Sequence, residues 1–155
     1  MTPAVTAAKR AGIDFDVLEY DAGDSREPYG IGAAHALGIA PERVFKTLVV
    51  DLSGRSLAIA IIPVAARLDL KAAASALGTK RATMAEPVAA ERATGYVRGG
   101  ISPLGQRRRL PFALDESALG FERIHVSGGR RGLEIGLAPS DLVSLVGAVV
   151  ARIAR

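Results

Sequence analysis

Lys46 is the residue whose type and position most strongly suggest chemistry. It lies within Val-Phe-Lys-Thr-Leu-Val-Val at residues 44–50, a run typical of a β-strand. An unpaired buried ammonium group is costly, so this lysine either extends its head to water or stands in a pocket ready for a phosphate or carbonyl oxygen. The strand alone leaves both interpretations open. Thr47 points to the opposite face, but its main-chain N–H remains available as a donor.

A glycine-proline loop is the second feature with chemical potential. It reads Gly-Tyr-Val-Arg-Gly-Gly-Ile-Ser-Pro-Leu-Gly at residues 95–105. Paired glycines let the backbone come close to a ligand, and the proline interrupts regular structure. The N–H groups before the proline could bind an ester carbonyl and stabilise its oxyanion, unless the segment is only a surface turn. The residues concerned are Gly99, Gly100, Ile101, Ser102 and Pro103.

Ser102 does not lie in a serine-hydrolase motif. Pro103 follows it directly, whereas a nucleophile elbow needs Gly-x-Ser-x-Gly at a strand-to-helix turn. His35 and His125 are expected to be packed or hydrogen-bonded rather than catalytic. The sequence also contains neither a Walker A loop nor a dinucleotide-binding glycine motif. A protein nucleophile is therefore not evident.

Basic residues surround the two features. The formal net charge of the chain is +4, which permits an anionic partner. Aromatic residues make up only 5% of the sequence, so recognition of a nucleic acid would use its backbone and shape more than base stacking. The alternative is scattered surface charge. The arginines predicted to contact phosphates are Arg98, Arg107, Arg108, Arg109, Arg130 and Arg131.

Composition narrows the class of protein. The 155 residues predict a single domain spanning 1–155, with an aliphatic core because 49% of residues are hydrophobic. The absence of cysteine excludes disulfides, thiolate metal sites and a cysteine nucleophile. We expect no metal and no cofactor. Without a signal peptide or an apolar run of membrane-spanning length, a cytoplasmic protein with no membrane partner is expected.

The elements that must position these residues alternate irregularly between helix and strand. Asp69 predicts the N-cap of a helix, and Gly78 its end. The strand at 56–62 is apolar on both faces, which indicates a central position. The pattern predicts an α+β fold with a mixed, strongly curved sheet or open barrel and flanking helices. Helices are predicted at 3–11, 30–37, 70–77, 87–94 and from Ser140 or Asp141 to the C-terminus; strands at 15–20, 44–52, 56–62 and 81–84, with a hairpin of 121–126 and 132–137; and a polar loop at 21–29.

Four stretches resemble one family. They are Val-Phe-Lys-Thr-Leu-Val-Val at 44–50, Ile-Pro-Val-Ala-Ala-Arg-Leu-Asp-Leu-Lys at 62–71, Thr-Gly-Tyr-Val-Arg-Gly-Gly-Ile-Ser-Pro-Leu-Gly at 94–105 and Val-Ser-Gly-Gly-Arg-Arg-Gly-Leu-Glu-Ile at 126–135. Together they resemble YbaK/EbsC-type bacterial deacylases, which are similar to the editing insertion domain of bacterial prolyl-tRNA synthetases. The resemblance covers nearly the whole chain. It implies that the protein deacylates mischarged Cys-tRNA(Pro) in trans, with the tRNA acceptor end and prolyl-tRNA synthetase as partners.

The resemblance also implies how the site works. The thiol of the bound cysteine attacks its own ester carbonyl, and the protein supplies positioning and oxyanion donors. Lys46 matches the essential lysine of the family, and the segment 100–103 matches the loop that cradles the ester. Glu134 departs from the aspartate expected there. The resemblance implies that this position contacts the substrate's ammonium group, and a solvent-facing side chain remains an alternative. The other residues implied at the site are Tyr20, Asp69, Ser127 and Gly128.

Two alternatives remain open at this stage. An alanine-specific or broader deacylase would keep the reaction, but it would need water or a ribose hydroxyl as nucleophile because alanine carries no thiol. A non-catalytic module that binds the acceptor end or a synthetase would fit the absence of a nucleophile equally well. Measured lifetimes of the esters separate these functions.

Overall fold

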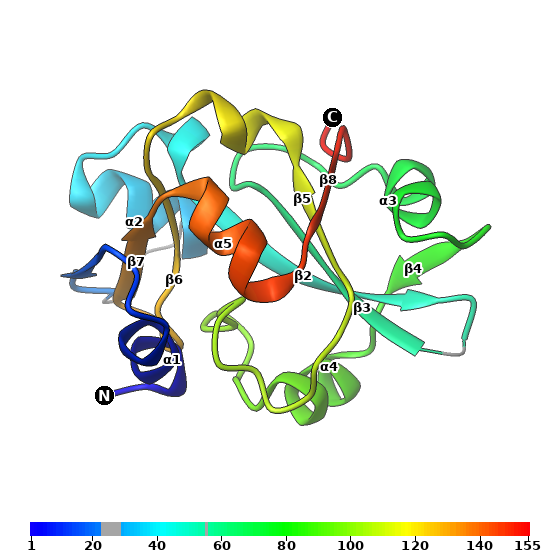
Figure 1. Ribbon diagram of the computed structural model, residues 1–155, viewed down its shortest axis with the longest axis horizontal. Helices are drawn as coiled ribbons and strands as arrows, with labels where there is room; N and C mark the ends of the chain where they lie inside the picture. The colour runs from blue at the N-terminus through cyan, green and yellow to red at the C-terminus, as the bar shows by residue number, and fades with distance from the viewer. Residues whose placement is uncertain (23–28, 55) are drawn as a thin grey trace.

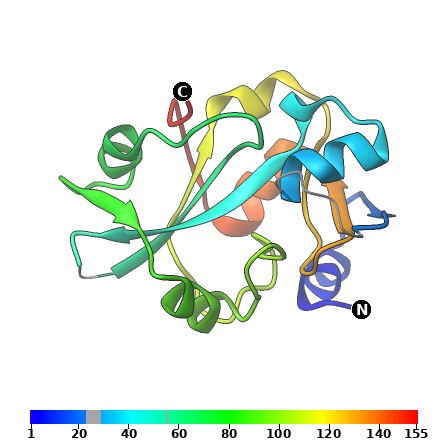
Figure 2. The same ribbon diagram turned by 180° about the vertical axis from the view of Figure 1, so that it is seen from behind.

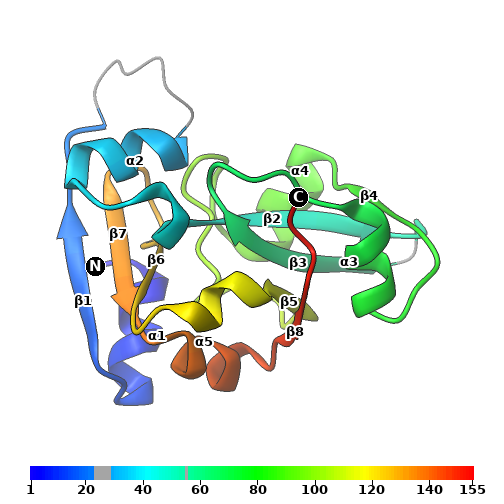
Figure 3. The same ribbon diagram turned by 90° about the horizontal axis from the view of Figure 1, so that it is seen from above.

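The strands form two sheets in the computed structural model, which describes residues 1–22, 29–54 and 56–155 (Figures 1 and 2). The larger is mixed and has the order β4-β2-β3-β5-β8. The smaller is antiparallel, has the order β1-β7-β6, and runs across the direction of β2 and β3 (Figure 3). Neither sheet closes into a barrel, and the α+β prediction is confirmed. The strands are β1 (Phe15–Glu19), β2 (Phe45–Leu52), β3 (Ser56–Pro63), β4 (Ala82–Met84), β5 (Phe112–Asp115), β6 (Ile124–Ser127), β7 (Leu133–Leu137) and β8 (Val149–Ala151).

Local signals determine most helix boundaries. Thr2 caps the first helix by accepting a hydrogen bond from the N–H of Val5, and Gly12, with φ of 68°, ends it. Asp69 caps α3 by accepting from the N–H of Ala72 at 3.0 Å, as predicted. The helices are α1 (Pro3–Ala11), α2 (Tyr29–Leu37), α3 (Leu70–Ala76), α4 (Pro87–Thr94) and α5 (Pro139–Val146), with 3₁₀ turns η1 (Pro41–Arg43) and η2 (Glu116–Gly120). Within the predicted loop at 21–29, residues 23–28 lie outside the described residues.

The large sheet is covered on both faces. Ala73 and Ala74 of α3 pack against one face of β2 and β3, where small side chains allow close approach. The opposite face packs in the main core with α1, α4, α5 and the small sheet. Strand β3 lies between β2 and β5, so the prediction of a central strand is confirmed.

The C-terminal prediction is wrong. The helix starts at Pro139 with Ala138 as its N-cap, not at Ser140 or Asp141. It ends at Val146 because Gly147 adopts a left-handed conformation with φ of 68°. The chain then continues as β8, parallel to β5, a strand that the sequence analysis did not predict. The hairpin is confirmed, but its first strand begins at Ile124.

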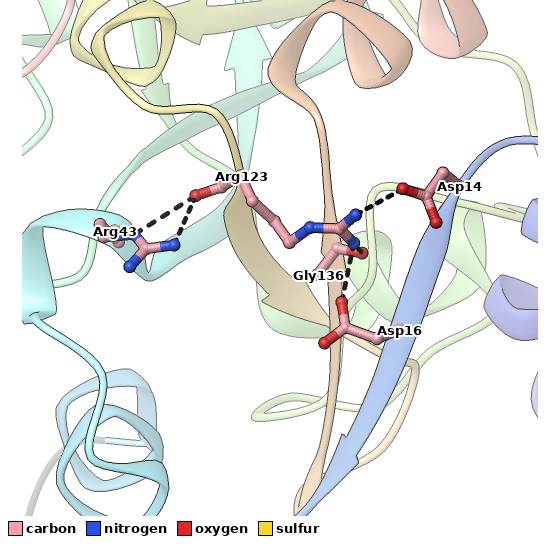
Figure 4. Close-up of polar contacts among 5 residues, drawn as sticks. All are labelled: Asp14, Asp16, Arg43, Arg123 and Gly136. Atoms are coloured by element: carbon pink, nitrogen blue, oxygen red, sulfur yellow. Dashed lines mark hydrogen bonds and ion pairs between the residues drawn. The ribbon is translucent and has the colours of Figure 1, made fainter.

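A polar cluster joins the small sheet to the start of β2 (Figure 4). The guanidinium of Arg43 donates to the main-chain oxygen of Arg123 through Nε at 3.4 Å and Nη2 at 3.3 Å. The guanidinium of Arg123 in turn donates to Asp14, Asp16 and the main-chain oxygen of Gly136, each at 2.8 Å. Because Arg43 precedes β2 by two residues, this cluster fixes where β2 runs relative to β6 and β7.

Candidate substrate site

A pocket of about 850 Å³ lies along the first half of β2. Residues 45–49 of β2 form one wall. Residues from α2 and Val64 line it as well, as do the β4–α4 segment, the glycine-proline loop and the hairpin of β6 and β7. The volume falls in the range of roughly 300–1,000 Å³ that is usual for sites binding drug-sized ligands, so an amino acid still attached to a nucleoside is of suitable size.

The pocket brings together about half of the residues that the sequence analysis singled out. Those lining it come from four separate segments, which is why no single motif defines the site. They are Tyr20, Lys46, Thr47, Arg98, Gly99, Ile101, Ser127, Arg131 and Glu134. The predicted residues that do not line it are Asp69, Gly100, Ser102, Pro103, Arg107, Arg108, Arg109, Gly128 and Arg130.

Lys46 is partly buried in the wall formed by β2. Removal of its ammonium group from water lowers the pKa of Lys46, and no counter-charge from the described residues offsets this effect. An amine of this kind is complemented by an incoming anion or carbonyl oxygen. Its place in the pocket wall favours the interpretation that Lys46 stands ready for a phosphate or carbonyl oxygen, rather than extending its head to bulk water.

Glu134 on β7 is only 6% exposed, which excludes a solvent-facing side chain. Burial raises the pKa of this carboxyl to about 8, with no hydrogen bond or charge pair offsetting it. The group therefore carries its proton at neutral pH and is uncharged. Burial also raises the pKa of Tyr20, and the nearby Glu134 adds to that effect. Both side chains therefore carry their protons and no charge at neutral pH.

The glycine-proline loop contributes to the pocket through Gly99 and Ile101. The N–H of Gly100 is already bonded to the main-chain oxygen of Val97 at 2.9 Å, so it closes a turn and does not face a ligand. Ser102 is fully buried, and its Oγ accepts from the N–H of Leu104 at 3.2 Å. Of the four residues expected to supply donors, Gly99 and Ile101 are therefore the two that line the pocket.

The remaining predicted substrate residues have structural surroundings. Asp69 caps α3, which packs on the face of the large sheet opposite the main core. Pro103 is buried behind the loop. The N–H of Gly128 donates to the main-chain oxygen of Leu133 at 2.7 Å and closes the hairpin. Ser127 lines the pocket, and its Oγ accepts from the N–H of Gly129 at 3.2 Å.

The arginines divide into two sets. Arg98 and Arg131 line the pocket and are exposed, so their charges are accessible from its mouth. Arg130 pairs with Glu19 at 3.4 Å on the surface. The run Arg107, Arg108 and Arg109 is exposed, and the first two bond through their main-chain N–H groups to the last turn of α4. The run thus lies outside the pocket.

Sequence reasoning missed two parts of the wall. One is the α2 segment with Gly30 and Ile31, where a Cβ at Gly30 would come within 2.3 Å of Cγ1 of Val64. The other is the segment from Met84 to Glu91. The glycine in an alanine-rich helix was the available signal for the first. No motif marked the second, since Met84, Ala85 and Pro87 carry no polar side chain that suggests chemistry.

The described residues contain no group of three or more histidine, aspartate or glutamate side chains placed to hold a metal ion. Within the same ranges, no helix has the length and apolar character needed to cross a membrane.

Comparison with known proteins identifies the family. Residues 32–145 match the model of the aminoacyl-tRNA editing domain. The chain belongs to the aminoacyl-tRNA editing domain family. The matched range contains the segments at β2, the glycine-proline loop and the hairpin that line the pocket. The enzyme class is therefore that of an aminoacyl-tRNA deacylase, as the resemblance implied.

Individual relatives agree with this assignment. A protein of Enterococcus faecalis (strain ATCC 700802 / V583), named "Putative Cys-tRNA(Pro)/Cys-tRNA(Cys) deacylase EbsC", is 42% identical over 120 residues, which cover 77% of this chain and 73% of that protein. A solved structure described as a "putative trans-editing enzyme for prolyl tRNA synthetase" is 27% identical with a TM-score of 0.87, covering 99% of this chain and 95% of the other. The structure of "hypothetical protein APE2540", 24% identical, has a TM-score of 0.87 and covers 99% of both chains, which shows the shared fold.

Proposed function

We propose that residues 1–155 form one trans-editing domain that cleaves the ester of mischarged Cys-tRNA(Pro). The observation that carries the proposal is a pocket of substrate size whose described lining residues include no cysteine, histidine or aspartate. Ser127, the serine among them, lies opposite Glu134 across the hairpin, but that carboxyl holds its proton at neutral pH, and the Oγ of Ser127 accepts from the N–H of Gly129. A pocket of this composition fits a reaction in which the substrate brings its own nucleophile. The E. faecalis relative, whose name includes Cys-tRNA(Pro), supports the choice of substrate.

The proposed chemistry is an internal displacement. The thiol sulfur of the esterified cysteine forms a bond to the ester carbonyl carbon, and the bond from that carbon to the ribose oxygen breaks. The thiol proton goes to the ribose oxygen, so the tRNA leaves with a free hydroxyl and the cysteine leaves as a thiolactone, which water can open to free cysteine. The protein contributes orientation of the two reacting groups and stabilisation of the oxyanion.

Seven of the lining residues have roles in this proposal. Lys46 binds a phosphate of the terminal adenosine or holds the ester, because burial alone lowers the pKa of its amine and no counter-charge from the described residues offsets that effect. The amides of Gly99 and Ile101 are oxyanion donors. The carbonyl oxygen of the protonated Glu134 carboxyl accepts a hydrogen bond from the substrate's ammonium group, with Tyr20 beside it. Arg98 and Arg131 contact the acceptor-end phosphates at the pocket mouth. We propose prolyl-tRNA synthetase as the partner that supplies the choice of tRNA.

The test compares deacylation of Cys-tRNA(Pro), Ser-tRNA(Pro) and Ala-tRNA(Pro). We expect rapid loss of cysteine, slow loss of serine and alanine, and loss of activity in Lys46→Met, which retains the apolar stem without the charge. Lys71→Ala is the matched control, because Lys71 is exposed on α3 away from the pocket. Rapid loss of alanine would overturn the thiol mechanism. Unchanged lifetimes of all three esters at saturating protein would overturn the enzymatic function.

A further inference from the structure

On the edge of β2 that faces the pocket, Thr47 has main-chain N–H and C=O groups without a backbone partner among the described residues. Main-chain groups of successive strand residues point alternately to the two neighbouring strands. The main-chain oxygen of Val44 accepts from the N–H of Val64, on the β3 side, at 2.8 Å. The oxygen of Val49 accepts from the N–H of Ala85, on the β4 side, at 3.0 Å. Thr47, two residues before Val49, therefore directs its N–H and C=O away from β3.

Among the described residues, no strand pairs with this stretch of the edge. Pairing with β4 covers Val50 to Leu52, with one further bond to the oxygen of Val49. Strand β6 packs against β2, but their backbones pair only at a bridge between Val44 and His125. Thr47 lies between these two points and lines the pocket. Unpaired N–H and C=O groups on a strand edge are normally covered or blocked in proteins, because they readily pair with another chain. Here the pocket leaves them available for a ligand.

The side chain of Thr47 adds a second unpaired group. Its Oγ1 is buried and has no hydrogen-bond partner, one of three such side-chain atoms in the described part of the chain. Burial of a hydroxyl without a partner is destabilising, since its hydrogen bonds to water are lost without replacement. The residue itself is partly exposed, so rotation about the Cα–Cβ bond can exchange hydroxyl and methyl and bring Oγ1 to the pocket.

We propose that Thr47 is a substrate-binding residue that holds the aminoacyl ester from the wall formed by β2. Its N–H donates to the ester carbonyl oxygen and to the oxyanion that develops there, and its hydroxyl hydrogen-bonds the adjacent α-amino group. The inference rests on the proposed function, because an aminoacyl ester is the ligand it assumes. The N–H of Thr47 would be a rigid donor on a sheet, placed across the reacting carbonyl from the loop donors at Gly99 and Ile101.

An aminoacyl ester suits this pair of groups. Its carbonyl oxygen and α-amino nitrogen are separated by two carbon atoms, as are the N–H and the hydroxyl of a threonine residue. Donors on a strand need no reorganisation when charge develops, which is the property that makes oxyanion stabilisation effective. Lys46, the preceding residue, points to the other face of β2, so neighbouring residues would address different parts of one substrate.

The side-chain test uses Thr47→Val, which replaces the hydroxyl by a methyl group of similar shape, and Thr47→Ser, which keeps it. We expect Thr47→Val to lower kcat/KM for Cys-tRNA(Pro) by about tenfold, the loss of one hydrogen bond, with Thr47→Ser close to wild type. Thermal unfolding of Thr47→Val should occur at the same or a higher temperature, because an unpartnered hydroxyl has been removed. Thr83→Val is the matched control, since Thr83 is an exposed strand residue on β4 that does not line the pocket.

The backbone test replaces the Thr47 N–H by an ester oxygen, through incorporation of the α-hydroxy analogue of valine, with Thr47→Val as its reference. We expect kcat to fall by roughly a further hundredfold, the usual effect of removing one oxyanion donor. Binding of an amide-linked cysteinyl-adenosine should weaken as well.

Wild-type rates in both the Thr47→Val and the ester variant, with an active wild-type protein, would overturn the assignment of Thr47 alone. A wild-type protein that cleaves no aminoacyl ester would instead overturn the proposed function and this inference with it. Loss of activity accompanied by a lower unfolding temperature in Thr47→Val would show a structural hydroxyl and also contradict the proposal.

Discussion

Replacement of Glu134 by glutamine should abolish a large pH dependence of stability. The carboxyl has a pKa of about 8 in the folded protein against an ordinary value of 4.5, because burial disfavours its charged form. Between these two values the folded state holds a proton that the unfolded state has released. The free energy of unfolding must therefore fall as pH rises through this window. The contribution of the protonated Glu134 to the free energy of unfolding is complete below about pH 4.5 and is lost above about pH 8.

The magnitude follows from the size of the shift. A difference between 4.5 and about 8 in the pKa of Glu134 corresponds to a loss on the order of 5 kcal/mol across the window. This is a large part of the roughly 5–15 kcal/mol by which domains are stable. Glutamine is neutral at every pH and has nearly the same shape, so Glu134→Gln should match wild type near pH 5 and be more stable at pH 9.

The assay is urea unfolding of both proteins at a series of pH values. All other titrating groups are common to the two chains, so the difference between the two free energies reports Glu134. We expect the difference to grow steadily in favour of glutamine from pH 5 to pH 9. A constant difference would refute the reasoning, because it would mean that the carboxyl is charged in the folded protein or that it titrates at its ordinary pKa.

Two further substitutions separate structural from substrate-binding roles. Asp69→Ala should cost about 1 kcal/mol of stability through loss of the α3 cap, with the deacylation rate per folded molecule unchanged; a folded but inactive variant would return Asp69 to the substrate site. Gly100→Ala should lower both stability, by about 1–3 kcal/mol, and activity, because its Cβ would lie 2.7 Å from the Cα of Arg130. Gly120→Ala, with nothing within 4 Å of the added Cβ, is the control, and equal urea midpoints for the two alanine variants would contradict this account.

Local patterns predicted the elements well where the determining residues are adjacent in sequence. Asp69 caps a helix and β3 is central because a cap and a doubly apolar run are local properties. The C-terminal error has the same origin: the apolar stripe continued past Gly147, and periodicity was given more weight than a residue that favours the left-handed conformation. Short β5 has only four residues, too few to show alternation.

The site could be predicted only in part, because its walls are set by contacts distant in sequence. Strand alternation allowed the side chain of Glu134 to face either the interior or solvent. Every residue of β7 is buried, so alternation along this strand does not distinguish the two. The loop amides looked equivalent in the sequence, yet only the fold shows that Gly100 bonds Val97 and that Ser102 lies in the interior. The edge at Thr47 depends on where β4 stops pairing with β2, which no local pattern specifies.

Three polar groups of the pocket, on Lys46, Thr47 and Glu134, share one physical property, which is that none has a hydrogen-bond partner among the described residues. Burial alone shifts the pKa of the Lys46 amine and that of the Glu134 carboxyl. The hydroxyl of Thr47 is buried without a hydrogen-bond partner among the described residues. Burial of such groups costs stability, so the fold retains them against the usual tendency to satisfy buried polar atoms. A substrate that supplies a phosphate for Lys46 and an ammonium group for Glu134 and the Thr47 hydroxyl would complement all three, and its ester carbonyl would accept from the Thr47 N–H. Cleavage removes the ester and separates the other two groups onto different products, so neither product complements the pocket fully, and the same polar groups that bind the substrate favour release of both products.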